Sequence, residues 1–433
     1  MNVHSVEKAE RIWFVNARVP GQLAEGFEVR AQPARDGLVT VAFGITPDGQ
    51  LTGQAQGGRC VDLGGRIVLP TFVDSHVHLD KSYIVRRTGI PDGGLPDAVR
   101  LSIADAVNWT EDDLRRRMTK ALERAFHHGA SAMRTHIDMW SMPAQSAAWR
   151  VISELREQWR GRIELQIVAL MGLDRVNEAN EYAERCRQIK ASDGILGVFI
   201  APGTATDDKL DAVFRFAAAM ELDVDFHVDE TIDPSAQSLE LICDSIIRTR
   251  FDRKVVAGHC CSLGTMPHVD RDRIIEKIVQ TGVHVISLPM SNLFLQDRAC
   301  GTTPSRRGLT AVHELRAAGA SVHFGSDNVQ DPFYPYGDYD MLTVFRIAVS
   351  AAHLDVDIGD WLARQFRSAA TACGFVGHGR LSVGSPANLI IFDAMDFFDL
   401  MSMSPSERLV LRNGRPIRPA SINLRNLLAL ELP

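Results

Sequence analysis

The feature that most constrains the fold is an alternation of apolar runs and helical segments that begins near residue 68. Eight strand-like runs follow one another, at residues 67–80, 131–138, 163–170, 194–200, 222–230, 254–260, 283–289 and 321–328. Near-continuous apolar strands that alternate with amphipathic helices are typical of a parallel sheet covered by helices. Eight such units predict an α/β fold of the (β/α)8, or TIM-barrel, type.

The segments between the runs have the period of helices. In residues 110–129, Thr110 is a suitable N-cap and Gly129 can end the helix. The apolar residues of this segment form one stripe, which consists of Leu114, Met118, Leu122, Ala125 and Phe126. Residues 270–282 repeat the pattern and end at Gly282. Both segments are predicted to be helices on the outside of the barrel.

The two ends of the chain differ from its middle. Residues 11–68 contain short segments in which apolar and polar residues alternate, separated by turns. The same pattern returns after about residue 380. The simplest interpretation is a small β-sandwich domain built from both termini. We therefore expect residues 1–68 and 380–433 in this domain and residues 69–379 in a catalytic barrel.

Composition limits the class of partner. The chain has 433 residues, 45% of them hydrophobic, and a net charge of −7 without long runs of Lys or Arg, so nucleic acid is not an expected partner. No uninterrupted apolar stretch reaches about 18 residues, so no membrane span is expected. The seven cysteines contain no CxxC pair and are expected to be reduced. We expect a cytoplasmic protein with a small-molecule substrate, and a homo-oligomer, because barrels of this class often self-associate.

Residues that can bind a metal gather at the ends of four of the runs. Active sites of TIM barrels lie at the carboxyl ends of the strands. His76 and His78 are two positions apart on a strand, so both side chains point the same way. Alone, such a pair is weak evidence, because buried strand histidines are often hydrogen-bonded to the backbone. The pair is strengthened by four further residues at strand ends, which are His227, Glu230, His259 and Asp327.

At these residues the chain resembles a known group of enzymes. The stretches "HVHLDK", "FHVDE", "GHCCSLG" and "GSDNVQDPFYPYGDYDML" are similar to the amidohydrolase superfamily, and most similar to its cytosine deaminase branch. The resemblance covers nearly the whole chain. It implies one divalent metal ion, Fe2+ or Zn2+, held by a set of four ligands, which are His76, His78, His227 and Asp327. It also implies that His259 hydrogen-bonds the metal-bound hydroxide or the tetrahedral intermediate, and that Glu230 shuttles protons.

Elementary chemistry agrees with these roles. Displacing ammonia from an aromatic amidine carbon needs a strong nucleophile, which a metal supplies by lowering the pKa of its bound water toward ~7. The ring nitrogen and the leaving amine must both be protonated, and Glu230 is the candidate carboxyl group. Asp327 can accept the proton of the attacking water, while His259 can stabilise developing charge. Relatives with two metals have a bridging lysine or glutamate after the fourth strand, where residues 197–202 offer none, so one metal is expected.

The substrate is less constrained. Cytosine deaminases of this branch have a glutamine just after the third strand, where this chain has Met171 and Gly172, so cytosine itself is in doubt. Asn328 stands where those enzymes have a second aspartate, and an amide can both donate and accept hydrogen bonds. Phe333 could flank a planar ring. His136 could contact the substrate or support the metal ligands.

Three functions remain open at this stage. The first is a metal-dependent deaminase that releases ammonia from an amino-substituted pyrimidine, triazine or purine-like ring. The second is an N-alkylamine-releasing enzyme of the N-isopropylammelide amidohydrolase type, which the "SDN" triplet at residues 326–328 resembles, or a cyclic amidase. The third is a catalytically silent metal-binding protein. Retention of Glu230 favours the first over the second, because the general-acid position of the N-isopropylammelide branch differs from the HxxE pattern of His227 and Glu230. The third is the least favoured, because a silent protein would be expected to have lost Glu230 or a metal ligand.

Overall fold

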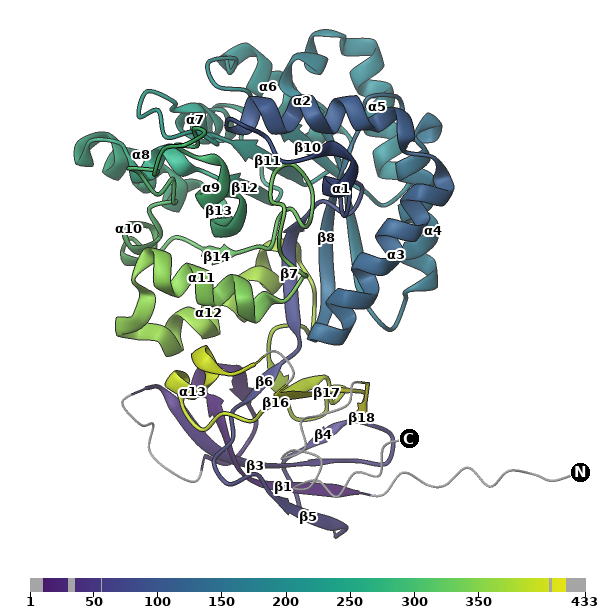
Figure 1. Ribbon diagram of the computed structural model, residues 1–433, viewed down its shortest axis with the longest axis vertical. Coiled ribbons are helices and arrows are strands. Elements are labelled where there is room, and N and C mark those ends of the chain that lie inside the picture. Colours follow the sequence, from purple (N-terminus) through teal and green to yellow (C-terminus); the bar gives the residue numbers. More distant parts are fainter. Residues whose placement is uncertain (1–10, 30–35, 56, 405–406, 418–433) are drawn as a thin grey trace, which may run out of the picture.

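The computed structural model describes residues 11–29, 36–55, 57–404 and 407–417. Figure 1 shows a large body of strands and helices standing on a smaller body of strands. The predicted fold class, a (β/α)8 barrel with a small β-domain from both ends of the chain, is confirmed. None of the helices in the described ranges combines the length and the apolar content that a bilayer-spanning segment requires.

The barrel consists of eight parallel strands in sequence order, one from each predicted run. They are β7 (Phe72–Val77), β8 (Ala130–Asp138), β9 (Glu164–Gly172), β10 (Ile195–Phe199), β11 (Val224–Val228), β12 (Val255–His259), β13 (His284–Ser287) and β14 (Val322–Phe324). The ring closes where Val77 bridges to Asp327, just beyond β14. At this closure the Asp327 N–H donates to the carbonyl of His76 at 2.8 Å, and the His78 N–H donates to the carbonyl of Asp327 at 3.3 Å.

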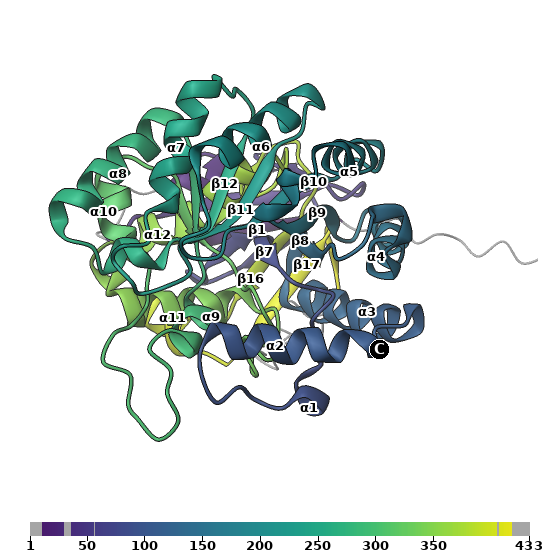
Figure 2. The ribbon, with the colours of Figure 1, turned by 90° about the horizontal axis from the view of Figure 1, so that it is seen from above.

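Helices surround the strands, as Figure 2 shows from above. They are α3 (Glu111–His128), α4 (Ala147–Gln158), α5 (Ala179–Ala191), α6 (Asp207–Ala219), α7 (Ser238–Thr249), α8 (His268–Thr281), α10 (Val312–Ala317), α11 (Met341–Ala352) and α12 (Ile358–Cys373). The predicted ends of α3 are confirmed, because Thr110 accepts a hydrogen bond from the Asp113 N–H and Gly129 has a φ of 96°. Gly282 ends α8 in the same left-handed conformation.

Shorter helices stand at the carboxyl ends of the strands. Between β7 and α3 the chain forms α1 (Val85–Thr88) and α2 (Leu95–Asp105), and after β13 it forms α9 (Pro289–Leu295). One more short helix, α13 (Phe397–Ser402), is not part of this group, because it follows all the strands and helices of the barrel along the chain. In Figure 1, α2 crosses the upper part of the barrel, on the side opposite the small β-domain.

The small domain contains two four-stranded sheets. One has the order β4-β3-β1-β5, formed by β4 (Leu51–Thr52), β3 (Leu38–Ile45), β1 (Ile12–Pro20) and β5 (Arg59–Asp62). The other has the order β18-β17-β16-β6, formed by β18 (Arg415–Pro416), β17 (Arg408–Arg412), β16 (Leu389–Phe392) and β6 (Val68–Pro70). The short strands β2 (Ala24–Glu25) and β15 (Leu381–Ser382) also pair. Residues 1–10 and 418–433 of the expected domain lie outside the described residues.

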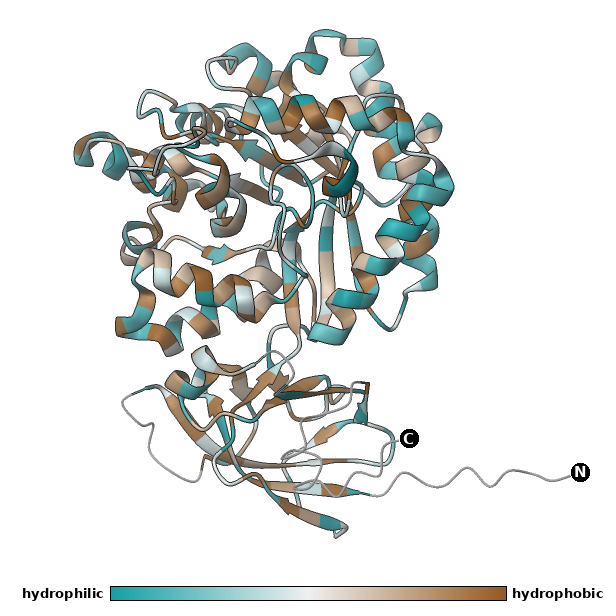
Figure 3. Ribbon diagram, viewed as in Figure 1, coloured by the Kyte–Doolittle hydropathy of each residue, from teal (hydrophilic) through white to brown (hydrophobic). Residues whose placement is uncertain are grey.

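Packing and one ion pair join the two bodies. Figure 3 shows apolar residues along the strands of the small domain and hydrophilic residues on the outer sides of the barrel helices. The guanidinium of Arg408 on β17 is fully buried and binds both carboxylate oxygens of Asp340, at 2.8 and 2.7 Å. Because Asp340 is the N-cap of α11, this bidentate contact ties the small domain to the barrel wall.

Candidate metal centre and active site

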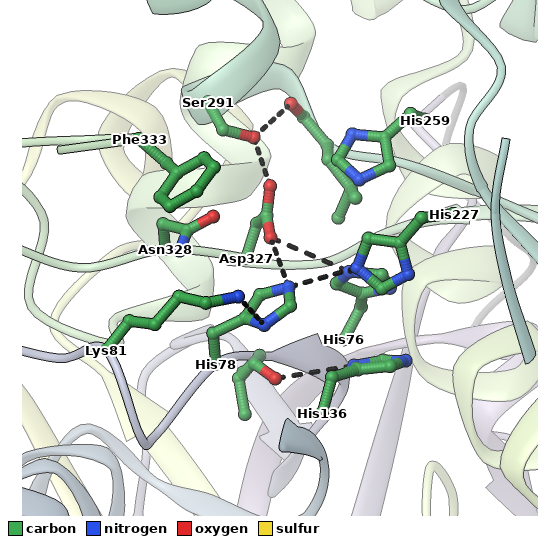
Figure 4. A network of polar contacts seen from close by, with 12 residues as sticks. His76, His78, Lys81, His136, His227, His259, Ser291, Asp327, Asn328 and Phe333 are labelled. Carbon is green, nitrogen blue, oxygen red and sulfur yellow. Dashed lines mark hydrogen bonds and ion pairs between the residues drawn. The ribbon is translucent and has the colours of Figure 1, made fainter. Parts of the chain in front are cut away.

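Four side chains from three strands of the barrel meet at one point. His76 lies on β7 and His78 directly follows it, while His227 lies on β11 and Asp327 follows β14. The Nε2 atom of His227 is 3.1 Å from Nε2 of His76 and 3.0 Å from Nε2 of His78. The Oδ1 atom of Asp327 is 3.6 Å from Nε2 of His76 and 3.4 Å from Nε2 of His78. Figure 4 shows these four side chains turned toward one another.

The spacing and chemistry of these donor atoms fit a divalent metal. Ligand atoms about 2.0–2.2 Å from one ion lie roughly 3 Å or slightly more from each other. Hydrogen bonding does not explain the cluster, because one N–H on His227 cannot serve both of its imidazole neighbours. The Oδ1 atom of Asp327 is buried and has no hydrogen-bond partner among the residues that the structure describes. Burial lowers the pKa of all three imidazoles well below the usual range, which leaves them in the neutral form that binds metals.

Neighbouring groups orient three of the four donors. Ser291 on α9 donates to the Oδ2 atom of Asp327, which leaves Oδ1 for the cluster. The Nδ1 atom of His78 is 3.2 Å from the amine of Lys81. Gly258 on β12 leaves room for His76, because a Cβ at this glycine would lie 2.9 Å from Cε1 of the imidazole. These contacts set the direction of the donor atoms of His76, His78 and Asp327 before any ion binds.

His136 lies beneath the four donors and does not line the cavity that adjoins them. It is fully buried, and its ring centre is 4.0 Å from that of His76. Its Nε2 atom is 3.1 Å from Oδ1 of Asp225, which also pairs with Arg134 at 2.9 Å. Of the two roles left open for His136, support of the metal ligands matches this position, whereas substrate contact does not.

Backbone conformation is unusual at two positions of the site. Asp327 has a φ of 59° and His259 a φ of 71°, in the left-handed region that non-glycine residues seldom adopt. Strained backbone of this kind persists where the surrounding structure holds it, and it is concentrated at functional sites. His259 is the last residue of β12, and Asp327 follows the end of β14. At both positions the chain turns sharply and directs the side chain toward the site.

Glu230 and His259 lie beside the four donors. The Nδ1 atom of His259 is 3.5 Å from Oε1 of Glu230 and 3.0 Å from the amide nitrogen of Asn292. Burial, and then the charge of Asp327, raises the pKa of Glu230 well above its usual range. Burial lowers the pKa of His259 to about 4. The site therefore contains a carboxyl group whose burial favours the protonated form and an imidazole that is uncharged near neutral pH.

Three of the four donors, His78, His227 and Asp327, line a cavity of about 380 Å³. Its polar lining consists of His78, Lys81, Ser102, Asp138, Arg175, His227, Glu230, His259, Asp327 and Asn328. Its remaining lining consists of Leu95, Val99, Ile103, Met139, Trp140, Leu170, Met171, Gly172, Phe199 and Phe333. The cavity thus brings together Met171, Gly172, Asn328 and Phe333, which the sequence singled out as substrate contacts.

Lys81 forms an ion pair and also lines the cavity. Its amine pairs with Asp138 at 3.0 Å, and it lies 5.2 Å from the centre of the Phe333 ring. The carboxylate of Asp138 balances the charge of Lys81. The two residues therefore line the cavity as an ion pair, and Lys81 is not an unpaired cation there.

Sequence reasoning missed one wall of the cavity. Leu95, Val99, Ser102 and Ile103, all on α2, line it, as does Arg175 in the turn after β9. The available signal was an extra amphipathic segment between the first strand and its barrel helix. Nothing in that segment marks it as a cavity wall, because only its placement across the barrel mouth gives it this role.

The fold and the site together indicate a class of enzyme. A (β/α)8 barrel with imidazole and carboxylate donors at the carboxyl ends of its strands is typical of metal-dependent hydrolases. The chain belongs to the amidohydrolase family, whose model matches residues 111–418, and is a hydrolase that acts on C–N bonds. This confirms the family resemblance found in the sequence motifs.

Individual relatives are similar over most of their length. A pterin deaminase of Rhizobium rhizogenes strain K84 is 39% identical over 98% of this chain and 97% of its own. The N-isopropylammelide isopropyl amidohydrolase of Pseudomonas sp. strain ADP is 22% identical over 82% of this chain and 87% of its own. The structure of 5-methylcytosine deaminase from Klebsiella pneumoniae liganded with phosphonocytosine has a TM-score of 0.76 and 25% identity, and it covers 95% of this chain and 98% of that one.

Proposed function

We propose that this protein is a mononuclear metal-dependent deaminase that removes the amino group of a nitrogen heterocycle as ammonia. The observation that carries the proposal is the convergence of four donors, in which His227 and Asp327 each lie 3.0–3.6 Å from both His76 and His78, beside a cavity that Glu230 also lines. The sequence of this chain is 39% identical to that of the pterin deaminase relative, and this similarity supports a pterin or a similar fused ring as substrate.

One divalent ion, Fe2+ or Zn2+, would be held by the cluster of His76, His78, His227 and Asp327. When bound, it supplies a nucleophile at neutral pH by lowering the pKa of water toward ~7. A single ion is supported by the end of β10, where Phe199 lines the cavity in a place where a bridging carboxylate or lysine would be needed for a second ion.

Glu230 is proposed to move the protons of the reaction. Because burial favours the protonated form of its carboxyl group, Glu230 can donate to the ring nitrogen next to the reacting carbon. As a carboxylate it can then take a proton from the attacking oxygen and deliver it to the departing amine. Asp327 can accept the first proton from water, and its position beside the imidazoles suits this role.

His259 is proposed to stabilise the oxygen that gains charge as the ring is attacked. Asn292 donates its amide N–H to Nδ1 at 3.0 Å, which places the imidazole proton on Nε2. That Nε2 atom is buried and has no partner among the described residues. It is thus available as a hydrogen-bond donor to the developing alkoxide.

The N-isopropylammelide relative keeps a second candidate function open, the release of an alkylamine. The apolar wall of Leu95, Val99 and Ile103 would suit an alkyl substituent. Both functions use the same metal donors, and they differ in the amine that leaves.

The test is a product assay on protein purified with Fe2+, Zn2+ or Mn2+. Ammonia release is measured for pterin, cytosine, 5-methylcytosine and amino-triazines, and alkylamine release for N-isopropylammelide. Glu230→Gln is expected to lower kcat by roughly 10²–10⁴-fold without loss of metal. Glu164→Gln, at an exposed glutamate outside the cavity, is the matched control and should retain full activity. Equal rates for wild type and Glu230→Gln would refute the proton-shuttle role, and release of alkylamine alone would replace the proposed function by the second one.

A further inference from the structure

The orientation of one amide on the cavity wall is fixed by a buried carboxylate. Asn328 directly follows Asp327 and lines the cavity. Its amide nitrogen donates to the Oδ2 atom of Asp331 at 2.7 Å. Both residues are almost completely buried, with exposed fractions of 3% for Asn328 and 0% for Asp331. The contact is therefore shielded from water and is not a surface pair that solvent weakens.

In its ionised form Asp331 is an acceptor only. Its Oδ1 atom accepts backbone N–H bonds from Phe333 at 2.8 Å and from Tyr334 at 3.0 Å, so the carboxylate is held by three donors. An ionised carboxylate cannot bond to the carbonyl side of an amide, because neither group offers a hydrogen. The Asn328 side chain is thus held with its NH2 group toward Asp331 and its carbonyl oxygen away from it.

The carbonyl oxygen of Asn328 has no hydrogen-bond partner within the described parts of the chain. In Figure 4 this oxygen lies on the side of Asp327. Asn328 lines the same cavity as Asp327 and Glu230, so its carbonyl oxygen faces the space that a bound ring would occupy. An acceptor at this point requires a donor on the ligand.

We infer that Asp331 is a positioning residue that turns Asn328 into a hydrogen-bond acceptor, so that the site selects rings with an N–H group next to the amino-bearing carbon. This inference rests on the proposed function and narrows its substrate class. Rings of the 2-amino-4-oxo type, such as pterin, carry this N–H. Rings in which the same nitrogen is unprotonated offer a lone pair that faces the lone pairs of Asn328.

Two pteridines of nearly equal size test the inference. Pterin has a hydrogen on the ring nitrogen between the amino-bearing carbon and C4, and 2,4-diaminopteridine has none there. Wild type is expected to prefer pterin by roughly tenfold or more in kcat/KM, the value of about one hydrogen bond. Burial raises the pKa of Asp331 to about 7, so assays at about pH 7.5 keep most of this carboxylate ionised while most of the pterin keeps its ring N–H. Products are identified by chromatography, so that loss of either amino group is distinguished.

Asp331→Asn frees the Asn328 amide to turn, because the new amide can either donate or accept. The preference for pterin is expected to fall at least about fivefold. Asn328→Ala is the second variant and should lose the preference even if Asp331→Asn folds poorly. Asp338→Asn is the matched control, because it removes an ion pair with Arg124 from the same loop while leaving Asn328 and Asp331 in place. A purely structural role for Asp331 would lower stability in both loop variants and leave the preference unchanged.

Binding constants for both rings, measured by pteridine fluorescence, separate this inference from the proposed function. Binding that prefers pterin in wild type but not in Asp331→Asn, without ammonia release, would overturn the proposed function alone. Turnover of both rings with the same preference in wild type and Asp331→Asn would overturn the inference alone. Failure of wild type to bind either ring would overturn the inference, while the proposed function would still be tested by the cytosine and triazine assays.

Discussion

The Nε2 atom of His76 lies 3.1 Å from the Nε2 atom of His227, and burial keeps both imidazoles neutral. Two buried imidazole nitrogens at this distance repel each other unless a proton or a cation lies between them. The proton explanation is insufficient because His78 makes the same approach to His227 at 3.0 Å. A cation shared by all three rings accounts for the arrangement.

Removal of His227 tests this directly. His227→Ala deletes the nitrogen that contacts both other imidazoles, so metal content is expected to fall from about one ion per chain to close to none. Metal analysis by mass spectrometry after dialysis measures the change. His268→Ala, at the exposed start of α8, should keep its metal. Retention of metal by His227→Ala would remove this residue from the ligand set.

A second prediction concerns the glycine that makes space for His76. A Cβ at position 258 would lie 2.9 Å from Cε1 and 3.1 Å from Nδ1 of the imidazole, closer than side chains approach one another. Gly258→Ala is therefore expected to displace the ring and to weaken metal affinity by roughly 10–100-fold, as changes next to a ligand do. Titration with a competing chelator measures this. Gly172→Ala meets no atom within 4 Å and should bind metal normally; equal affinities would mean that His76 does not need its observed position.

The wall formed by α2 depends on Arg87. Its Nε atom contacts Asp105 at the end of α2 at 2.7 Å, and its Nη2 atom contacts Asp113 on α3 at 2.9 Å. Arg87→Ala should loosen α2 and raise KM by roughly three- to tenfold, the size of about 1 kcal/mol of lost ion pairing. Metal content should not change, because α2 carries no donor. Arg100→Ala on the exposed face of α2 is the control, and an unchanged KM in Arg87→Ala would show that α2 is held by packing alone.

Asp113 should make stability depend on pH. Burial raises the pKa of this carboxyl group, but hydrogen bonds from Arg87 and Arg117 outweigh it and lower the pKa to about 2. A folded-state pKa below the unfolded value of about 3.9 contributes stability that is present above about pH 4 and is lost as the pH falls toward 2. The urea midpoints of wild type and Asp113→Asn should therefore differ by a constant amount above about pH 4.5 and converge below it. Asp112→Asn, an exposed neighbour, should follow wild type; a constant gap at all pH values would show that the charge of Asp113 is not responsible.

Part of this molecule was readable from the sequence because its signals are local. The period of the apolar residues indicated eight strands and the helices between them, and a parallel barrel places all strand ends on one face. His76, His78, His227, Glu230, His259 and Asp327 could be grouped for this reason alone. The order of these residues along the chain and their positions at strand ends were enough to predict that they share one site.

Other features depend on contacts between residues that are far apart in the chain. Only the closure of β7 against the end of β14 brings Asp327 to His76 and His78. Only the path of α2 across the barrel makes Val99 and Ile103 a cavity wall, because their spacing is that of any amphipathic helix. The sequence determined that Asn328 has an amide that can donate or accept. The tertiary structure decided between the two, because the buried carboxylate of Asp331 accepts from the amide nitrogen and leaves the oxygen for the ligand.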